Sequence, residues 1–247
     1  MNYQSIWDDQ HRKEAWDLMI DVSNNLKIPL SPTLSTAINY IHYYFEISGK
    51  LDLPLFQIAI LAIFVASKTQ ETVFKADDLI DAFVTVGLQR DANQLKILGT
   101  NIEFLDSIKN QDTENYSEYR KMFLDSELDF MTAMKWKFPN HDPFHILKKW
   151  FNDLKNAVGN EDYDSISNQL NSSSTNALCF LIVFPDSLYT KDEDLVAAAF
   201  EYAWQQMSIQ THWSTIINYN TSNETFSLLL NRLKEFNEQS VSTKNEQ

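Results

Sequence analysis

The sequence has few residues that break helices and only one that can cross-link the chain. Its 247 residues include four glycines, six prolines and a single cysteine. The scarcity of glycine and proline disfavours turn-rich β folds and suits long helices with short connections. Cys179 cannot form an intrachain disulfide, so nothing requires an oxidising compartment. Because Cys179 lies in the apolar run Ala177–Phe184, we expect a buried, unreactive thiol.

Basic residues are also scarce. Lysine and arginine total 20 against 34 aspartates and glutamates, which gives a formal net charge of −14. Nucleic acids and anionic membranes attract clusters of lysine and arginine, so the composition disfavours direct nucleic-acid binding and membrane association. An acidic surface suits a basic protein partner, although solubility alone also explains it.

Signals for membrane insertion and for catalysis are missing as well. The longest uninterrupted apolar run, Ile58–Ala66, is too short to span a bilayer, and the N-terminal segment is polar. We therefore expect an intracellular protein. Without a glycine-rich phosphate loop, a serine-centred elbow or a supported Cys/His dyad, we expect no enzyme, no catalytic residue and no cofactor. His141 and His145 lie four apart without a third ligand, so we expect no metal site.

Helical periodicity dominates the sequence. The stretch that begins at Pro54 and contains Ile58–Ala66 is apolar on nearly every side, which predicts a helix in the middle of a bundle. Asp77 or Asp78 is the expected cap of the helix that follows it. Residues 88–116 give no clear pattern and form a candidate insert. The helices predicted around the central one cover residues 9–26, 32–47 (with Ser31 as its cap), 76–86 and 117–134.

A break at Phe138–Pro143 divides the chain, and Asp142-Pro143 is a strong helix start. We predict domains at 1–139 and 140–238, followed by a polar, frayed tail at 239–247. The fold class is therefore all-α, with two consecutive bundles of five helices. The helices predicted in the second half cover residues 143–157, 165–184, 192–208, 212–218 and 223–237.

Several weak motifs occur together in the order of a known family, and they resemble the two cyclin boxes of the cyclins over residues 10–236. The likeness is greatest to the transcriptional cyclins of the T and K type. Departures from the family pattern include Gln70 in place of a glutamate, a long segment at 88–116, and the lack of an apolar docking patch at His11–Ala15. The motifs are Arg12, Thr36-Ala37-Ile38-x-Tyr40-x-His42-x-x-Phe45, Ala66-Ser67-Lys68-x-x-Glu71, Glu127 before an apolar run ending at Trp136, and His141-Asp142-Pro143-Phe144.

The resemblance implies a regulatory cyclin subunit without catalysis of its own. Its partner would be a cyclin-dependent kinase catalytic subunit, and its location would be nuclear. The likeness to the T and K type favours a kinase that phosphorylates the C-terminal repeat tail of RNA polymerase II, while kinases of the cyclin C, H and L type stay open. Further subunits of a transcription complex remain an open partner class. The alternative is an adaptor on the same fold, like the B-type general transcription factors, which binds nucleic acid or protein without activating a kinase. The shortage of basic residues disfavours that alternative.

The resemblance also implies a kinase-binding group, made of Phe64, Lys68, Glu71, Glu127 and Trp136. A lysine ammonium can donate to carbonyls and a carboxylate can accept from amides at the ends of a kinase helix. We expect Lys68 and Glu127 to lie close together and to pair, which would fix the lysine before binding.

Ordinary structural roles also explain these residues. Lys68 suits the negative end of a helix dipole, Glu127 a solvated helix face and Phe64 a core, while Trp136 fits core and interface equally. His42, on an apolar face, is expected to be a hydrogen-bonded core histidine.

Overall fold

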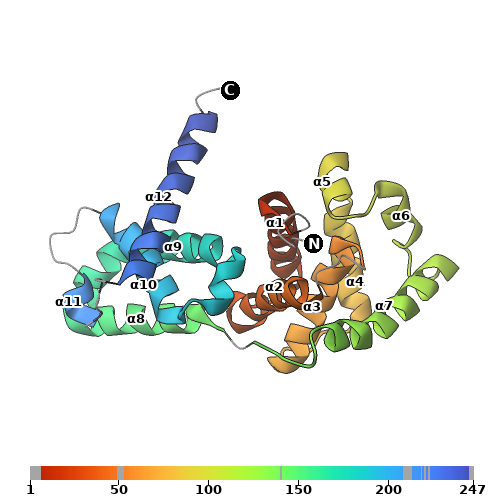
Figure 1. Cartoon of the computed structure of the whole chain (residues 1–247), viewed down its shortest axis with the longest axis horizontal. Helices are drawn as coiled ribbons and strands as arrows, with labels where there is room; N and C mark the ends of the chain where they lie inside the picture. The colour runs from red at the N-terminus through yellow and green to blue at the C-terminus, as the bar shows by residue number, and fades with distance from the viewer. Residues whose placement is uncertain are drawn as a thin grey trace. The chain divides into compact units, whose positions relative to one another are not determined.

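A computed structural model describes residues 7–48, 53–139, 141–207, 213–217, 219, 221 and 223–244. All regular secondary structure among these residues is helical, which confirms the predicted all-α class (Figure 1). The chain folds into two compact units, Met1–His141 and Asp142–Gln247, and each is described by itself below. Within the described ranges, no helix has the length and apolar character needed to cross a membrane.

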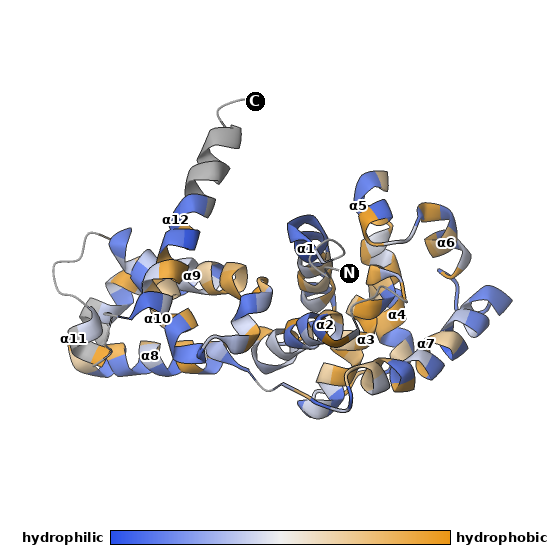
Figure 2. Cartoon of the chain, in the orientation of Figure 1, coloured by the Kyte–Doolittle hydropathy of each residue, from blue (hydrophilic) through white to orange (hydrophobic). Residues whose placement is uncertain are grey.

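The first unit is built around α3, Leu55–Thr69. Every residue from Leu55 to Ser67 is buried, because α1, α2, α4 and α7 pack around this helix (Figures 1 and 2). Five core helices match the predicted bundle, and the candidate insert adds two shorter ones. The surrounding elements are α1 (Asp9–Leu26), the wide turn η2 (Leu30–Leu34), α2 (Ser35–Ser48), α4 (Ala76–Gly87), α5 (Ala92–Ile97), α6 (Ile102–Ser107) and α7 (Glu114–Ala133).

The predicted helix from Pro32 with Ser31 as its cap agrees with the dihedral angles. Ser31 is extended, and helical angles run from Pro32 through the end of η2 into α2, which is assigned from Ser35. The predicted cap of α4 is wrong. Lys75 occupies the cap position, and Asp77 lies inside the first turn, where its carboxylate accepts bonds from Arg120 and Tyr116 of α7. The Asp77 carboxylate therefore bonds to side chains of α7 and not to the backbone amides at the start of its own helix.

The candidate insert folds as α5 and α6, and polar contacts attach it to α1. Gln94 completes a capping box with Asp91 and also donates to Glu14 at 3.2 Å. Arg90 pairs with Asp21 and lies 3.8 Å from Glu14.

Close packing joins α6 to α4. A Cβ atom at Gly87 would lie 2.9 Å from a methyl group of Leu105, so any larger residue would require the Leu105 side chain to shift.

The second unit is centred on α10, Asp192–Gln205, which contacts α8, α9 and α12. Asp194 accepts bonds from Tyr219 and Asn223, which ties the segment before α12 to the central helix. The fourth predicted helix of this half begins at 212 and the third ends at 208, and both positions lie outside the described residues. The other helices are α8 (Pro143–Val158), α9 (Asn160–Ile182), the turn η3 (Pro185–Tyr189), α11 (Trp213–Ile217) and α12 (Glu224–Lys244).

The end of α12 corrects a further prediction. The sequence predicts a helix to residue 237 and a frayed tail from 239, yet α12 continues to Lys244. Polar composition alone does not end a helix, since glutamate, glutamine and lysine are good helix formers.

The link between α4 and α7 predicts an acid-dependent loss of stability. The bond from Arg120 lowers the pKa of Asp77 below its usual 3.8, so the carboxylate is favoured in the folded chain. The stabilisation is therefore complete above pH 3.8 and is lost as the pH falls through the lowered value. We expect the difference in unfolding midpoint between the native chain and Asp77→Asn to shrink between pH 5 and pH 3. Asp106→Asn, at an exposed position on α6, is the control, and a difference that does not change with pH would contradict the prediction.

The single cysteine gives a second prediction. Cys179 is only partly exposed, and burial raises the pKa of its thiol to about 12. The thiolate is the reactive form, so we expect an aromatic disulfide reagent at pH 8 to modify the folded chain at least about a hundredfold more slowly than the urea-unfolded chain. Absorbance of the released thiol gives both rates, and equal rates would show that the thiol is not protected.

Candidate functional site

The last turn of α3 brings a lysine out of the core. Lys68 has 41% of its side chain exposed, although the thirteen residues from Leu55 to Ser67 are buried. Its ammonium nitrogen lies 2.5 Å from Oε1 of Glu127 and 4.0 Å from the ring centre of Phe64. The pairing of Lys68 with Glu127, predicted from the sequence, is therefore confirmed. We call Lys68 and Glu127 the surface pair, and Phe64 its supporting ring.

Packing between α3 and α7 fixes the position of Glu127. The ring of Phe123 lies 5.3 Å from that of Phe64, and Gln57 donates to the Ser126 hydroxyl at 3.1 Å. Glu127 retains 17% exposure of its side chain. Because these contacts hold the two helices together next to Glu127, the ion pair lies at a defined place on the surface.

Polar contacts hold the segment after α3 against α2 and η2. The Tyr40 hydroxyl lies 2.9 Å from that of Thr69, and the Thr33 hydroxyl donates to Thr72. Gln70, which replaces a glutamate of the family pattern, donates to the Thr36 hydroxyl at 3.1 Å. The side-chain amide of Gln70 therefore makes a hydrogen bond within the chain. Glu71 follows in a left-handed conformation with φ 56° and is exposed.

The turn after α7 displays two aromatic side chains. Lys135 and Trp136 have φ values of 54° and 57°, in a region that costs a non-glycine residue about 1–2 kcal/mol. The Trp136 amide donates to the Met131 carbonyl at 3.0 Å, which satisfies the helix end. Trp136 is 54% exposed and Phe138 36% exposed, with the Phe138 ring 5.7 Å from that of Tyr40.

An apolar stripe on α7 was missed by the sequence reasoning. Leu124, Leu128 and Met131 follow each other at spacings of four and three, so they share a face next to Glu127. Leu128 is 56% exposed, and the other two are partly exposed. The signal was present, because α7 carries this stripe in addition to its core residues Phe123 and Phe130. Phe138 was likewise missed.

The structure brings together only part of the predicted group. Phe64 is 5% exposed and lies beneath Lys68, so it supports the pair from inside. The Glu71 and Trp136 side chains make no hydrogen bond or ion pair with other described residues. A kinase-binding role for all five residues stays a prediction.

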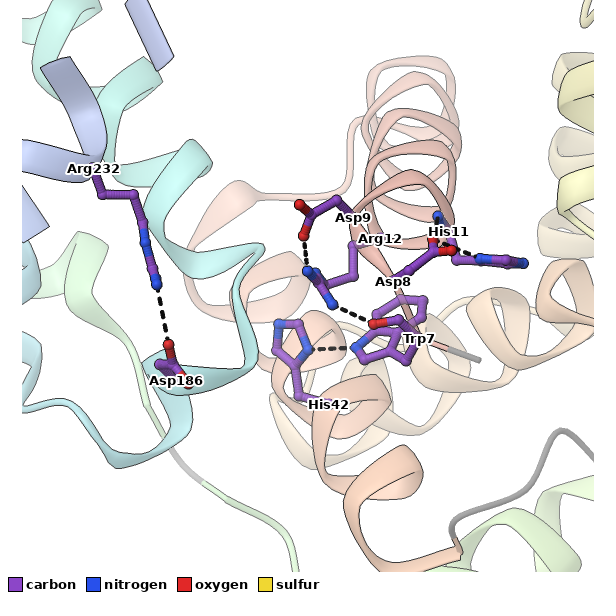
Figure 3. A network of polar contacts seen from close by, with 8 residues as sticks. All are labelled: Trp7, Asp8, Asp9, His11, Arg12, His42, Asp186 and Arg232. Carbon is purple, nitrogen blue, oxygen red and sulfur yellow. Dashed lines mark hydrogen bonds and ion pairs between the residues drawn. The ribbon is translucent and has the colours of Figure 1, made fainter. Parts of the chain in front are cut away.

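A second polar cluster fixes the start of α1 (Figure 3). The indole N–H of the fully buried Trp7 donates to Nδ1 of His42 at 2.9 Å, and its ring stacks on Phe45. The Arg12 guanidinium donates to the Trp7 carbonyl and to Asp9. His42 is therefore a core histidine, as predicted.

A separate ion pair joins two elements of the second unit. Arg232 of α12 donates to Asp186 of η3 at 3.2 Å (Figure 3). The guanidinium also lies 4.5 Å from the ring centre of Phe184. This pair is a local tie between α12 and η3.

The surface pair should matter little for stability. Ion pairs at this degree of exposure contribute at most about 1 kcal/mol, since water screens them and two side chains lose freedom. We expect a double-mutant cycle with Lys68→Ala and Glu127→Ala, measured by urea unfolding, to give a coupling below about 1 kcal/mol. Both variants should remain folded, and a coupling above about 2 kcal/mol would contradict this assignment.

Comparison with known proteins adds two findings. The sequence model of the family "Cyclin, N-terminal domain" matches residues 1–138. The chain is 23% identical over 208 residues to Cyclin pch1 of Schizosaccharomyces pombe, an alignment that covers 83% of this chain and 53% of that protein. The chain therefore matches about half the length of this curated relative.

Proposed function

The chain belongs to the cyclin family, and we propose that it is a regulatory subunit that binds and activates a cyclin-dependent kinase. Cyclins are regulatory subunits and not enzymes. One observation carries the proposal: Lys68 and Glu127 form an ion pair at the exposed end of the most buried helix. Neither residue is needed to complete the core, and both keep hydrogen-bonding capacity for another chain.

The chemistry of the pair suits the ends of a helix. An ammonium has three donors and Glu127 uses one, so Lys68 can still donate to the free carbonyls of a partner helix. The second carboxylate oxygen of Glu127 can accept from backbone amides. Activation of a kinase requires its regulatory helix to be held inward, so that a lysine–glutamate ion pair forms in the kinase active site. A pre-formed surface pair reduces the ordering cost of this grip.

Exposed apolar residues next to the pair supply contact area. The stripe Leu124–Leu128–Met131 borders Glu127, and Trp136 and Phe138 follow at the end of α7. Full burial of a leucine is worth about 1.5–3 kcal/mol, and aromatic residues are frequent anchors of interfaces. The apolar face of the kinase helix would therefore pack on the stripe, and the ends of that helix would bond to the surface pair.

We further propose that the kinase acts on the C-terminal repeat tail of RNA polymerase II and that the complex is nuclear. The support is the likeness of the sequence motifs to the T and K type of transcriptional cyclin. Additional subunits of a transcription complex belong to the same proposal. The net charge of −14 disfavours the alternative of a nucleic-acid adaptor on the same fold.

Kinase binding can be tested by affinity purification of the tagged full chain. The purified complex is then assayed for kinase activity on a polymerase-tail peptide. With the co-purified kinase expressed separately, we expect Lys68→Ala to weaken binding by at least about 2 kcal/mol, because its removal leaves a desolvated partner group unsatisfied. Isothermal titration gives the affinity. Trp136→Ala should also weaken binding, through lost apolar area.

Lys109→Ala is the matched control, since it removes an exposed lysine that follows α6. We expect this variant to bind the kinase as the native chain does. An unchanged affinity of the folded Lys68→Ala variant would show that the surface pair is not the grip. A purified chain that shifts DNA or RNA at moderate salt and carries no kinase activity would favour the adaptor.

A further inference from the structure

The segment after α7 is basic and aromatic, although the chain as a whole is acidic. Lys135, Trp136, Lys137 and Phe138 follow one another and are all exposed. No aspartate or glutamate occurs from residue 130 to residue 141, whereas the whole chain has 34 acidic and 20 basic residues. We call these four residues the basic turn. Because they are consecutive, two ammonium groups flank one exposed indole ring.

Contacts within the first unit hold the basic turn in place. Lys135 and Trp136 both have left-handed backbone angles, which reverse the chain after α7. The Phe138 ring lies 5.7 Å from that of Tyr40, and the Tyr40 hydroxyl lies 2.9 Å from that of Thr69 on α3. One tyrosine thus joins the basic turn to the helix end that carries the surface pair.

The ammonium groups of the basic turn are not used within the part of the chain that the structure describes. Lysines after a helix often bond to its last carbonyls. Neither Lys135 nor Lys137 makes a side-chain hydrogen bond or an ion pair with a described residue. An exposed aromatic ring with a polar rim is typical of an interface anchor. Complementary charge on a partner would therefore be negative.

The net charge of the chain selects among anionic occupants. A nucleic acid is repelled at long range by a net charge of −14, and so is a second copy of this chain. A different protein that is not strongly acidic overall, but carries a local acidic segment, avoids this repulsion. The basic turn therefore fits an acidic segment of another protein better than a nucleic acid or a second copy.

We propose that the basic turn binds an acidic segment of the partner kinase. An apolar side chain of that segment packs on Trp136, and its carboxylates pair with Lys135 and Lys137. That the segment belongs to the kinase rests on the proposed function. The basic turn selects among kinases by charge, because a kinase with a basic segment at this place would meet two like charges.

A peptide titration tests the acidic contact without the kinase. The probes are acetyl-Glu-Leu-Asp-Leu-Glu-amide and acetyl-Lys-Leu-Lys-Leu-Lys-amide, added to the ¹⁵N-labelled full chain and followed by NMR. The signal lost in Trp136→Phe identifies the reporting indole N–H. We expect the acidic peptide to shift this signal saturably and the basic peptide to leave it unchanged. General attraction to an acidic chain predicts the reverse, so an equal or larger shift with the basic peptide would overturn the proposal.

Two matched double variants locate the charge effect. Lys135→Gln with Lys137→Gln should bind the acidic peptide at least about threefold more weakly. Lys148→Gln with Lys149→Gln removes the same charge from exposed positions of α8 and should bind like the native chain. All four lysines are exposed, and the spectra report whether each variant is folded. Equal losses in the two variants would overturn the proposal in favour of a general charge effect.

Binding of the co-purified kinase separates this inference from the proposed function. At about 50 mM salt, we expect Lys135→Gln with Lys137→Gln to lower the association rate constant at least about threefold, with little change in dissociation, because exposed charges act mainly on association. Biolayer interferometry gives both rates. An unchanged or faster association would overturn the inference and leave kinase binding in place. A chain that binds the acidic peptide at Trp136 but no kinase would contradict the proposed function and leave the charge preference of the basic turn in place.

Discussion

The burial of α3 on all sides is the constraint from which the first unit follows. A helix with no polar face cannot lie on a surface, so four other helices must surround it. Only its final turn reaches water, and the side chain placed there is Lys68. The packing of the whole unit therefore fixes the position of the Lys68 ammonium, and this charge is held at one place on the surface.

The ends of the helices are held by contacts that differ in kind from the core. Hydroxyl and amide groups of Thr33, Thr36 and Tyr40 hold the segment after α3, and left-handed residues end α3 and α7. Such ends carry the exposed aromatic residues and the surface pair. Apolar burial therefore positions the helices. Hydrogen bonds and turn geometry at the helix ends determine which side chains are exposed there.

Local pattern explains what could be predicted from the sequence. The bounds of α1 and the burial of α3 follow from periodicity, and the closeness of Lys68 and Glu127 followed from motif order. Partners remote in sequence explain the failures. Asp77 bonds to Arg120 of α7 and does not cap its own helix. The exposure of Trp136 depends on two left-handed residues that no propensity favours.

Gly87 lies where three helices approach one another. A Cβ atom there would lie 2.9 Å from a methyl group of Leu105 on α6 and 3.2 Å from the ring of Phe56 on α3. Even alanine at this position would therefore require both neighbouring side chains to shift. The absence of a side chain at position 87 thus allows the insert and the central helix to meet the same point of α4, which makes this point a junction between the insert and the core of the first unit.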